Sequence, residues 1–577
     1  MERKLWHEHK WPPGVPWEID GYHKPLFSLL DEAARKWPRA TYTIFQGAER
    51  TFSQVHEIAA RIARFLSSRG IQKGDRVALF LPNLPFYPQI FFGILKAGAA
   101  CVTCNPLYTE AELKQQLADS GARGVFVLDH PKMYPTACEA VKGTDVEFVV
   151  FCRISEELPL LKSLVGGLLG KIPRAASHQH GHLGLDEILA SNPPEPPDVV
   201  IDPSEDLAQI IYTGGTTGIP KGAALTHQNL VSNVMAVHQT VRYPHEEGGP
   251  PETLRLGGFH TFLGVLPWYH SFGLTLCMLW SCYTGSRLVC IPDPRAGKPP
   301  FTEVLKAVER YKTTVIAGVP TLYVAFTNHP LVDRFDLTSV KACGSGGAPL
   351  PVEVARRFEA KTGAVLFEGY GLSETSPVLT LNPTNEELRK FGTVGLPLPS
   401  TDIKILDPET GDRELEHGQD GEIAACGPQV MQGYWNRPKE NERVFRTIDG
   451  KRYFLTGDIG HFDEEGFLVI TDRKKDMIIV SGFNVYPREV EEVLFEHPKV
   501  ELAAVIGVPD ERSGEAVKAF VKLKAGEQAT EQEILDFCRQ RLAGYKRPRS
   551  VEFRSELPLS VVGKVLRREL RREYLES

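Results

Sequence analysis

Residues 212–222 read Tyr212-Thr213-Gly214-Gly215-Thr216-Thr217-Gly218-Ile219-Pro220-Lys221-Gly222, and they directly follow the apolar run 207–211. The apolar run predicts a strand, and the glycines after it predict a tight loop. Glycine allows positive φ and lets backbone N–H groups approach an anion, while the threonine hydroxyls and Lys221 add donors and charge. We therefore expect a strand that leads into a polyphosphate-binding loop.

The spacing differs from that of the Walker loop, in which Ser or Thr follows the lysine and holds Mg²⁺. Here Gly222 follows Lys221, so another residue must hold the metal. A flexible glycine-threonine hairpin with a solvated lysine is the alternative interpretation of this loop.

Length and charge narrow the class of protein. A chain of 577 residues is several times the usual domain size, so we expect a large N-terminal part and at least one separate module. A net charge of −7 argues against nucleic acid as a partner. The ten cysteines are scattered, which favours a reducing cytoplasm, and Cys101 and Cys104 have no second pair at zinc-site spacing. Residues 1–17 lack the apolar core of a signal peptide, so we expect no export.

Helical and strand patterns alternate between residues 27 and 150. The helical segments are 27–36, 52–69 and 86–97, and the strand segments are 76–81, 99–102, 124–128 and 148–151. This alternation predicts an α/β fold with doubly wound parallel sheets. Short strands with frequent Gly and Pro around residues 421–435 predict a small β-barrel subdomain.

Several later motifs contain polar groups suited to a nucleotide. Tyr370 offers a flat face for adenine and Ser373 a hydroxyl for phosphates, in the run Glu368-Gly369-Tyr370-Gly371-Leu372-Ser373-Glu374-Thr375. Glu374 could bind Mg²⁺, which usually takes only one or two protein carboxylates when it bridges phosphates. Asp458, in the run 455–460, could accept hydrogen bonds from both ribose hydroxyls. A surface turn is the alternative interpretation for Glu374.

These motifs, taken in order, resemble those of the acyl-adenylate-forming family, which includes acyl-CoA synthetases, luciferase-like ligases and peptide-synthetase adenylation domains. The other matching runs are 266–273 (LPWYHSFG), 340–349 (VKACGSGGAP), 449–475 and 557–568 (LPLSVVGKVLRR). Two positions differ from the family's motifs. Gly214 stands where the family commonly has Ser, and residues 451–454 stand where the long-chain acyl-CoA synthetase signature usually has a shorter segment that contains Trp. The likeness covers essentially the whole chain and is greatest to bacterial long-chain fatty acid–CoA ligases.

The resemblance assigns roles residue by residue. It implies catalytic roles for Lys564, His270, Lys221 and Ser373, and a metal ligand at Glu374. It implies nucleotide or CoA contacts by Thr213, Gly214, Gly215, Thr216, Thr217, Gly218, Lys221, Gly346, Gly347, Ala348, Pro349, Glu368, Gly369, Tyr370, Gly371, Ser373, Asp458, Arg473, Lys475, Ser481, Gly482 and Lys564. A lone histidine among aromatic residues is more often a core residue, so His270 depends on the resemblance alone.

The resemblance also implies the domain organisation and the reaction. Residues 1–472 would form the adenylation domain, 473–476 a hinge, and 477–577 a small mobile α+β lid domain. A long-chain fatty acid would react with ATP and Mg²⁺ to give acyl-AMP and pyrophosphate, and coenzyme A would then displace AMP. Medium-chain, branched or aryl acids remain alternative substrates. A non-catalytic lipid-binding protein is disfavoured, because Lys221, Glu374, Asp458 and Lys564 are all present.

Residues 158–174 are mostly apolar, and their charged residues are the basic Lys162, Lys171 and Arg174, with no acidic residue. Such a segment could lie on an anionic membrane, which would place a cytoplasmic protein peripherally on the inner face of the membrane. The alternative is an insertion packed on its own domain, since three glycines weaken any helix. The apolar stretch 259–291 is too interrupted to span a bilayer. The oligomeric state stays open, with a dimer among the alternatives.

Overall fold

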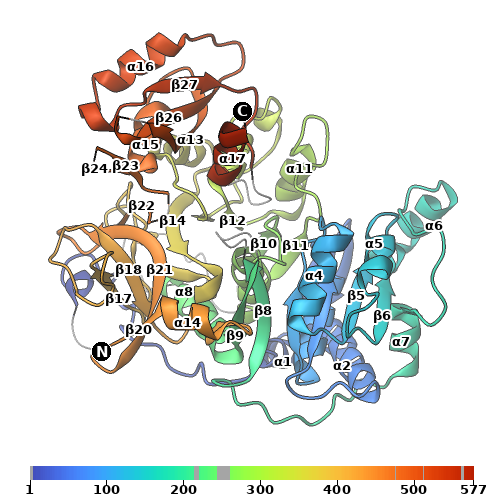
Figure 1. Ribbon diagram of the computed structural model, residues 1–577. Coiled ribbons are helices and arrows are strands. Elements are labelled where there is room, and N and C mark those ends of the chain that lie inside the picture. The colour runs from blue at the N-terminus through green and yellow to red at the C-terminus, as the bar shows by residue number, and fades with distance from the viewer. Residues whose placement is uncertain are drawn as a thin grey trace.

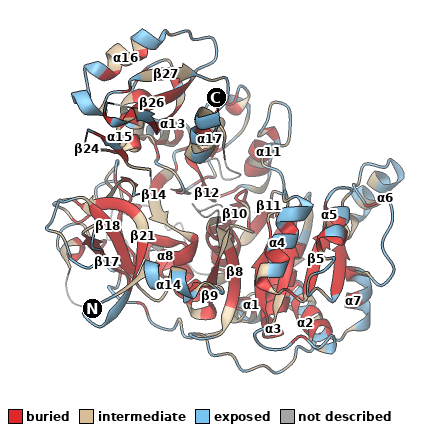
Figure 2. Ribbon diagram, in the orientation of Figure 1, coloured by how far each residue is buried: buried red, intermediate tan, exposed pale blue. Residues whose placement is uncertain are grey.

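The computed structural model describes residues 4–213, 220–242, 260–474, 476–481, 483–510, 512–559 and 565–576. Two large sheets covered by helices form most of the chain, a smaller antiparallel sheet lies beside them, and a C-terminal module lies above all three in Figure 1. The central strands of both large sheets are buried, whereas the edge strand β2 has no buried residue, and most helices expose one face, as Figure 2 shows. The predicted α/β class is confirmed.

The first large sheet has the strand order β19-β9-β8-β4-β3-β5-β6-β7. Its strands are β3 (Arg76–Phe80), β4 (Ala100–Thr103), β5 (Gly124–Leu128), β6 (Phe148–Cys152), β7 (Leu183–Gly184), β8 (Leu207–Thr213), β9 (Lys221–Thr226) and β19 (Gly433–Tyr434). Strands β3 to β8 pair in parallel, whereas β9 and β19 are added antiparallel at one edge. The helices of this part are α2 (Phe52–Ser68), α3 (Phe86–Lys96), α4 (Glu110–Ser120), α5 (Met133–Ala140), α6 (Leu160–Leu168) and α7 (Leu185–Ser191), with the 3₁₀ turn η2 (Ile154–Glu157).

The second large sheet has the order β16-β15-β14-β13-β12-β10-β11-β1-β2. Its strands are β1 (Thr41–Phe45), β2 (Ala48–Thr51), β10 (Thr261–Gly264), β11 (Arg287–Cys290), β12 (Val315–Gly318), β13 (Ala342–Ser345), β14 (Val365–Gly371), β15 (Val378–Leu381) and β16 (Leu396–Pro397). Its helices are α1 (Ser28–Lys36), α8 (His227–Arg242), α9 (Ser271–Gly273), α10 (Trp280–Tyr283), α11 (Thr302–Tyr311), α12 (Pro320–Thr327) and α13 (Val352–Thr362), with the π-helix η3 (Leu274–Leu279) and the 3₁₀ turns η4 (Val332–Arg334) and η5 (Ser373–Thr375). The sequence patterns did not predict the β1–β2 hairpin at its edge.

The region predicted as a small barrel is a five-stranded antiparallel sheet. Its strands are β17 (Asp402–Leu406), β18 (Gly421–Cys426), β20 (Phe445–Ile448), β21 (Lys451–Phe462) and β22 (Leu468–Arg473), and helix α14 (Pro438–Val444) precedes β20. The N-terminal turn η1 (Leu5–His7) packs on this sheet, where the Trp6 ring stacks on Phe462 with centroids 5.1 Å apart. The aromatic N-terminus therefore completes the core of a subdomain that lies hundreds of residues later in the chain.

The C-terminal module has a mixed sheet with the order β24-β23-β26-β25, and β27 pairs with β26. Its elements are β23 (Ile478–Val480), β24 (Phe483–Val485), α15 (Pro487–Phe495), β25 (Val500–Asp510), β26 (Gly514–Leu523), α16 (Glu531–Arg539), η6 (Gly544–Lys546), β27 (Ser550–Phe553) and α17 (Arg567–Glu576). Two apolar clusters of its own fill it, one around Val505 and Val521 and one around Phe520 and Leu570. The chain leaves β22 at Arg473 and enters β23 at Ile478, and the hinge predicted at 473–476 stays a prediction.

Helix α6 lies in the segment 158–174, for which the sequence left two alternatives open. It forms despite Gly166 and Gly167, and none of its residues is buried. The alternative in which this segment packs its apolar side chains on its own domain therefore does not hold for α6. Within the described part of the chain, no helix combines the length and the apolar character needed to cross a bilayer.

Candidate functional site

A cleft of about 400 Å³ separates the edge of the first large sheet from the antiparallel sheet. Strand β19 and helix α14 form one wall, and β18, β21 and β22 form the other. Basic side chains outnumber acidic ones five to two in its lining, which consists of Lys221, Glu409, Thr410, Gly411, Glu422, Tyr434, Arg443, Val444, Arg446, Phe454, Leu455, Thr456, Gly457, Arg473 and Lys474. A cleft of this charge and size suits a polyanion such as a nucleotide.

Lys221 opens strand β9, directly opposite Thr213 at the end of β8. The predicted phosphate loop therefore closes a β-hairpin, and its residues 214–219 lie outside the described residues. The Lys221 ammonium forms an ion pair with Glu440 of α14, with Nζ 2.5 Å from Oε2. It also lies 5.3 Å from the centroid of the Tyr434 ring, within reach of a cation–π attraction. The lysine is thus held at the cleft wall by two groups that the sequence analysis did not single out.

Tyr434 connects Lys221 to the proposed metal ligand. Its hydroxyl donates a hydrogen bond of 2.7 Å to Oε1 of Glu374, while the face of its ring receives the lysine. Glu374 is 7% exposed, and burial raises the pKa of its carboxyl group above the usual value, an effect that the Tyr434 hydroxyl opposes. A phosphate chain reaching Lys221 would therefore pass close to a carboxylate already oriented by a hydrogen bond.

The turn that carries Glu374 is tied to the segment that follows His270. The Oγ atoms of Ser271 and Ser373 are 3.1 Å apart, and Thr275 Oγ1 donates to the Ser376 carbonyl at 2.8 Å. His270 caps this segment, with Nδ1 accepting from the Phe272 N–H at 3.3 Å. Burial lowers the pKa of His270 to about 4, so the imidazole is neutral at physiological pH. A neutral ring next to a carboxylic substrate can orient the acid but does not add charge.

Two glycines of the predicted adenine site are explained by close approach of other backbone atoms. A Cβ at position 371 would lie 1.7 Å from the Pro377 carbonyl oxygen, and one at position 346 would lie 3.2 Å from the Gly369 carbonyl oxygen. Side chains cannot be added at these positions without moving β14 or β15. Gly347 differs, since its φ of +80° itself favours glycine. The backbone packing of the predicted adenine site therefore requires these glycines, whether or not a base contacts them.

Asp458 and Arg473, both predicted to contact the nucleotide, form an ion pair. They lie opposite each other on β21 and β22, and the Arg473 Nε is 3.0 Å from Asp458 Oδ1. Tyr370 donates its hydroxyl to the other carboxylate oxygen at 2.7 Å. Asp458 is 3% exposed, so its charge is stabilised by these two partners. The three residues form a rigid polar group at which a diol could bind.

Glu368 lies at the boundary between the second sheet and the C-terminal module. It faces Ser345 across β13 and β14 and accepts the Leu350 N–H at 3.1 Å. Burial raises its pKa to about 7, and the charge of Arg488 on α15 opposes that rise. The protonation of Glu368 therefore depends partly on where the C-terminal module sits.

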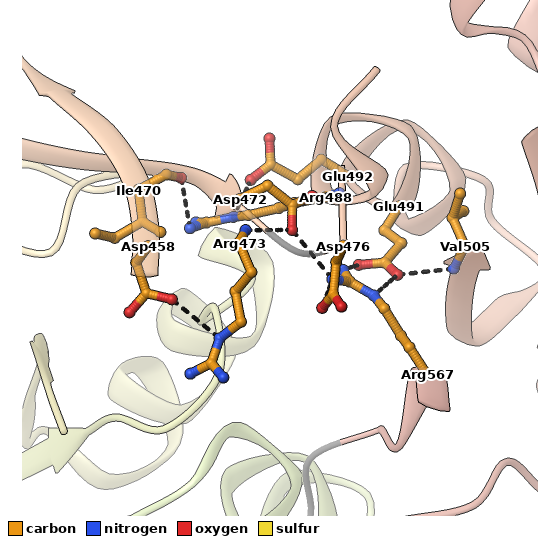
Figure 3. A network of polar contacts seen from close by, with 10 residues as sticks. All are labelled: Asp458, Ile470, Asp472, Arg473, Asp476, Arg488, Glu491, Glu492, Val505 and Arg567. Carbon is orange, nitrogen blue, oxygen red and sulfur yellow. Dashed lines mark hydrogen bonds and ion pairs between the residues drawn. The ribbon is translucent and has the colours of Figure 1, made fainter. Parts of the chain in front are cut away.

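A dense ionic network surrounds the link between the two parts of the chain (Figure 3). Arg567 of α17 pairs with Asp472 at 3.1 Å, with Asp476 at 3.2 Å and with Glu491 at 2.6 Å. Asp472 also accepts the Arg488 N–H at 2.7 Å. The Arg473 N–H donates to Asp472 at 2.7 Å, while its side chain points away from this network toward Asp458, as Figure 3 shows. The C-terminal module is therefore held in one orientation by charges on both sides of the link.

The predicted site residues fall into three groups. Lys221 and Tyr434 line the cleft, and Tyr434 connects Lys221 to Glu374. Arg473 also lines the cleft and joins Tyr370 and Asp458 in a second group. Ser481 is an exposed turn residue that follows β23. The predicted site residues that lie outside the described part of the chain are Gly214, Gly215, Thr216, Thr217, Gly218, Lys475, Gly482 and Lys564. Tyr434 and Glu440 were not among the predicted site residues, although Tyr434 lies in the region 421–435 that was predicted to contain short strands.

The AMP-binding enzyme family matches residues 30–435, and the AMP-binding enzyme C-terminal domain matches residues 489–564. The chain belongs to the AMP-binding enzyme family. The expected family is thereby confirmed, and the two matched regions correspond to the large N-terminal part and the C-terminal module.

Three relatives of this AMP-binding enzyme are informative. A long-chain-fatty-acid–CoA ligase of Bacillus subtilis (strain 168) is 41% identical over 98% of each chain. The anthranilate CoA ligase AuaEII, solved with anthranoyl-AMP, has a TM-score of 0.80 and 26% identity, covering 96% of this chain and 98% of its own. ATP-bound MatB from Rhodopseudomonas palustris has a TM-score of 0.75 and 29% identity, covering 96% and 99%.

The donor set at the cleft fits Mg²⁺ held mainly by phosphates. Among the described residues, no group of three or more His, Cys, Asp or Glu side chains could form a metal site by itself. Glu374 provides one buried carboxylate whose orientation is fixed by Tyr434. Mg²⁺ bridging ATP phosphates typically takes one or two protein carboxylates and completes its shell with phosphate oxygens and water.

Proposed function

We propose that this AMP-binding enzyme is an ATP-dependent long-chain fatty acid–CoA ligase. The observation that carries the chemistry is Tyr434, which lines the cleft and contacts both Lys221 and Glu374. Arg473, the ion-pair partner of Asp458, lines the same cleft. The choice of a fatty acid is supported by the 41% identity, over nearly the full length, with a relative named as a long-chain-fatty-acid–CoA ligase.

In the first step, a carboxylate oxygen of the fatty acid attacks the α-phosphorus of ATP. The bond from that phosphorus to the bridging oxygen breaks, and pyrophosphate leaves with the electron pair. Lys221 and the loop 213–218 would bind the phosphates, and Mg²⁺ held by Glu374 would neutralise part of their charge. Asp458 would accept the ribose hydroxyls, Tyr370 and the loop 346–349 would contact adenine, and Lys564 would stabilise charge in the transition state.

In the second step, the sulfur of coenzyme A attacks the acyl carbonyl and AMP leaves. The thiol loses its proton in this exchange, so the products are a thioester and AMP. By family position, Lys564 withdraws as the C-terminal module rotates at 473–476, and the turn at Ser481 and Gly482 approaches to guide the pantetheine. His270, neutral and tied to the Ser373 turn, would orient the acid in both steps.

We also propose that the enzyme works in the cytoplasm. All ten cysteines are free, which fits a reducing compartment. Domain limits of 1–472 and 477–577, and a dimeric state, remain proposals. Peripheral contact with a membrane belongs to the same proposal.

The test is pyrophosphate release by the purified protein with MgATP and coenzyme A, measured across acids from acetate to oleate and including benzoate and anthranilate. We expect kcat/KM to be greatest for long-chain acids and the thioester to form only when coenzyme A is added. A maximum for benzoate or anthranilate would overturn the fatty substrate and leave the adenylation chemistry standing. Pyrophosphate release by none of the acids would overturn the ligase proposal.

A further inference from the structure

Helix α6 exposes an unusual concentration of large apolar side chains. Leu160, Leu161, Leu164, Val165 and Leu168 are 78%, 73%, 57%, 45% and 88% exposed, and Leu169 just beyond the helix is 61% exposed. Large apolar side chains scattered singly are normal on a surface, but a contiguous group usually marks a binding site. Figure 2 shows α6 as an exposed helix that projects from the body at the edge of the first large sheet.

The apolar side chains of α6 form one stripe. Leu160, Leu164 and Leu168 follow one another at a spacing of four, as do Leu161 and Val165, so all five share a face of the helix. The opposite side is fixed to the protein: Lys162 Nζ donates to the Gln46 carbonyl at 2.7 Å. The stripe is thus turned away from the body.

The segment that returns from α6 holds the helix in this orientation. Lys171 N–H donates to the Gly166 carbonyl at 2.8 Å, and a Cβ at position 166 would lie only 3.0 Å from Cγ1 of Ile172. Gly166 therefore provides the space for Ile172 behind the stripe. Gly166, which would weaken an isolated helix, thus allows the helix and its return segment to pack closely, whereas a Cβ at Gly167 would meet no atom within 4 Å.

The charges that the segment itself carries have one sign. Lys162, Lys171 and Arg174 are exposed, and no acidic residue occurs between positions 158 and 185. Within the described part of the chain, neither Lys171 nor Arg174 is paired with a carboxylate. This arrangement contrasts with the whole chain, whose net charge is −7. An apolar stripe with a basic border is complementary to a bilayer surface that contains anionic headgroups.

A second copy of the chain fits the stripe less well. A helix of nine residues is only about 14 Å long, at about 1.5 Å per residue, so its stripe offers a small area. A standard interface buries about 800 Å² on each partner. Two copies meeting at this helix would also bring their basic borders together. A lipid surface meets neither difficulty.

We propose that α6 and its return segment, residues 158–174, form a docking surface for anionic phospholipid bilayers. The leucine stripe enters the boundary between headgroups and acyl chains, and Lys171 and Arg174 contact headgroup phosphates. This surface rests on its own geometry, and it would also deepen the proposed function by placing the ligase where long-chain fatty acids partition.

The test is co-sedimentation of the full-length protein with vesicles, in the absence of ATP, acid and coenzyme A. Vesicles of phosphatidylcholine mixed with phosphatidylglycerol are compared with vesicles of phosphatidylcholine alone. The double variant Leu164→Gln/Leu168→Gln makes two of the five stripe residues polar without changing charge. The control Val200→Gln makes an exposed apolar side chain polar in the linker before β8, where Val200 is 83% exposed. The double variant Lys171→Gln/Arg174→Gln removes two charges.

We expect the wild type and Val200→Gln to bind the mixed vesicles, and the leucine variant to bind at least about tenfold more weakly. The charge variant should lose about thirtyfold, at about 1 kcal/mol per basic residue near an anionic surface. Failure of the wild type to bind mixed vesicles, or equal binding by the leucine variant and Val200→Gln, would overturn the proposal.

Sedimentation equilibrium without vesicles tests the competing occupant. If the leucine variant dissociates a wild-type dimer, the stripe is a contact between copies and the lipid proposal is overturned. Because the vesicle assay needs no catalysis, a negative result there leaves the pyrophosphate assay as an independent test of the ligase reaction.

Discussion

Glu440 pairs with the ammonium group of Lys221 at the cleft wall. A carboxylate at this position occupies a donor that the proposed ATP complex would use for phosphate, so the two anions compete for one lysine. The Lys221 side chain is 17% exposed and that of Glu440 26%, so the pair is partly screened by water. ATP binding must therefore replace an interaction of modest strength, not a deeply buried one.

Glu440→Gln should lower the KM for ATP with little change in kcat. A partly exposed ion pair contributes up to about 1 kcal/mol, which corresponds to a decrease of about threefold to fivefold. Steady-state kinetics with ATP varied would measure it. Glu442→Gln removes the same charge from an exposed position on the same helix and serves as the control. An equal KM shift in both variants would mean that general electrostatics, not the Lys221 pair, is responsible.

The raised pKa of the Glu368 carboxyl group predicts that the stability of the fold depends on pH. Its folded pKa is raised from 4.5 to about 7, chiefly by burial, so the folded protein binds this proton more tightly than the unfolded chain. That stabilisation is fully present below pH 4.5 and is lost as the pH rises through 7. Glu368→Gln removes the titration, and relative to wild type it should gain up to about 3 kcal/mol in unfolding free energy at high pH.

Chemical denaturation at about pH 5 and about pH 8 would measure this effect. The unfolding free energy of Glu368→Gln, relative to that of the wild type, should be greater at the higher pH. Glu353→Gln, an exposed change on α13, is the control. If the stability difference between wild type and Glu368→Gln were the same at both pH values, burial would not be raising the pKa of this carboxyl group.

At the scale of elements, hydrophobic patterns predicted the parallel strands well, because each is an apolar run buried on both faces. Strand β5 has the predicted limits, and β3, β4 and β6 begin or end within one or two residues of them. The β1–β2 hairpin was not predicted because its second strand, Ala48–Thr51, has no buried residue and so lacks an apolar signal. Helix α6 was left open because glycine weighs against a helix, whereas here Gly166 accommodates Ile172.

The site was predictable residue by residue but not in its contacts. Lys221 and Glu440 are 219 positions apart, and Tyr370 and Asp458 are 88 apart. No local sequence pattern links residues so far apart. The sequence could therefore assign a ligand to some of them, but it could not show that they form ion pairs or hydrogen bonds with one another. Tyr434 could have been found only through its place at the end of a short edge strand beside β9.

Arg567 joins α17 to α15 and to the link between the two parts of the chain, so Arg567→Ala should free the C-terminal module. Its side chain is 20% exposed, and that of its partner Asp472 is 2% exposed. Removing one member of such a pair leaves a buried charge unpaired, at a cost of about 3–5 kcal/mol. We expect faster proteolytic cleavage between 473 and 478 and a larger radius of gyration by small-angle X-ray scattering.

Arg571→Ala is the matched control for Arg567→Ala, because Arg571 lies on the same helix and pairs with Glu515 inside the C-terminal module. Its loss should leave the link protected. Equal cleavage of Arg567→Ala and the wild type would show that the network in Figure 3 does not hold the module in place.

At the scale of the whole molecule, the C-terminal module has its own apolar core and is joined to β22 by a short link. The contacts that fix its orientation are ionic or polar: Arg567 with Asp472, the Arg488 N–H with Asp472, and the charge of Arg488 near Glu368. Such contacts can exchange with water at a lower cost than a buried apolar interface. A module with an independent core and a polar interface is suited to rigid-body rotation.

Lys475→Pro tests that rotation. Lys475 lies outside the described residues, between Lys474, whose N–H donates to Gly457, and Asp476, whose N–H donates to Arg473. Proline fixes φ near about −65°, so a hinge at this position could no longer adopt two conformations. We expect acyl-AMP formation, measured as single-turnover pyrophosphate release, to be reduced much less than thioester formation from preformed acyl-AMP. Lys475→Ala removes the same side chain but leaves φ free, so it should retain thioester formation. If proline reduced both half-reactions equally, or if alanine reproduced its effect, the link would not be the hinge.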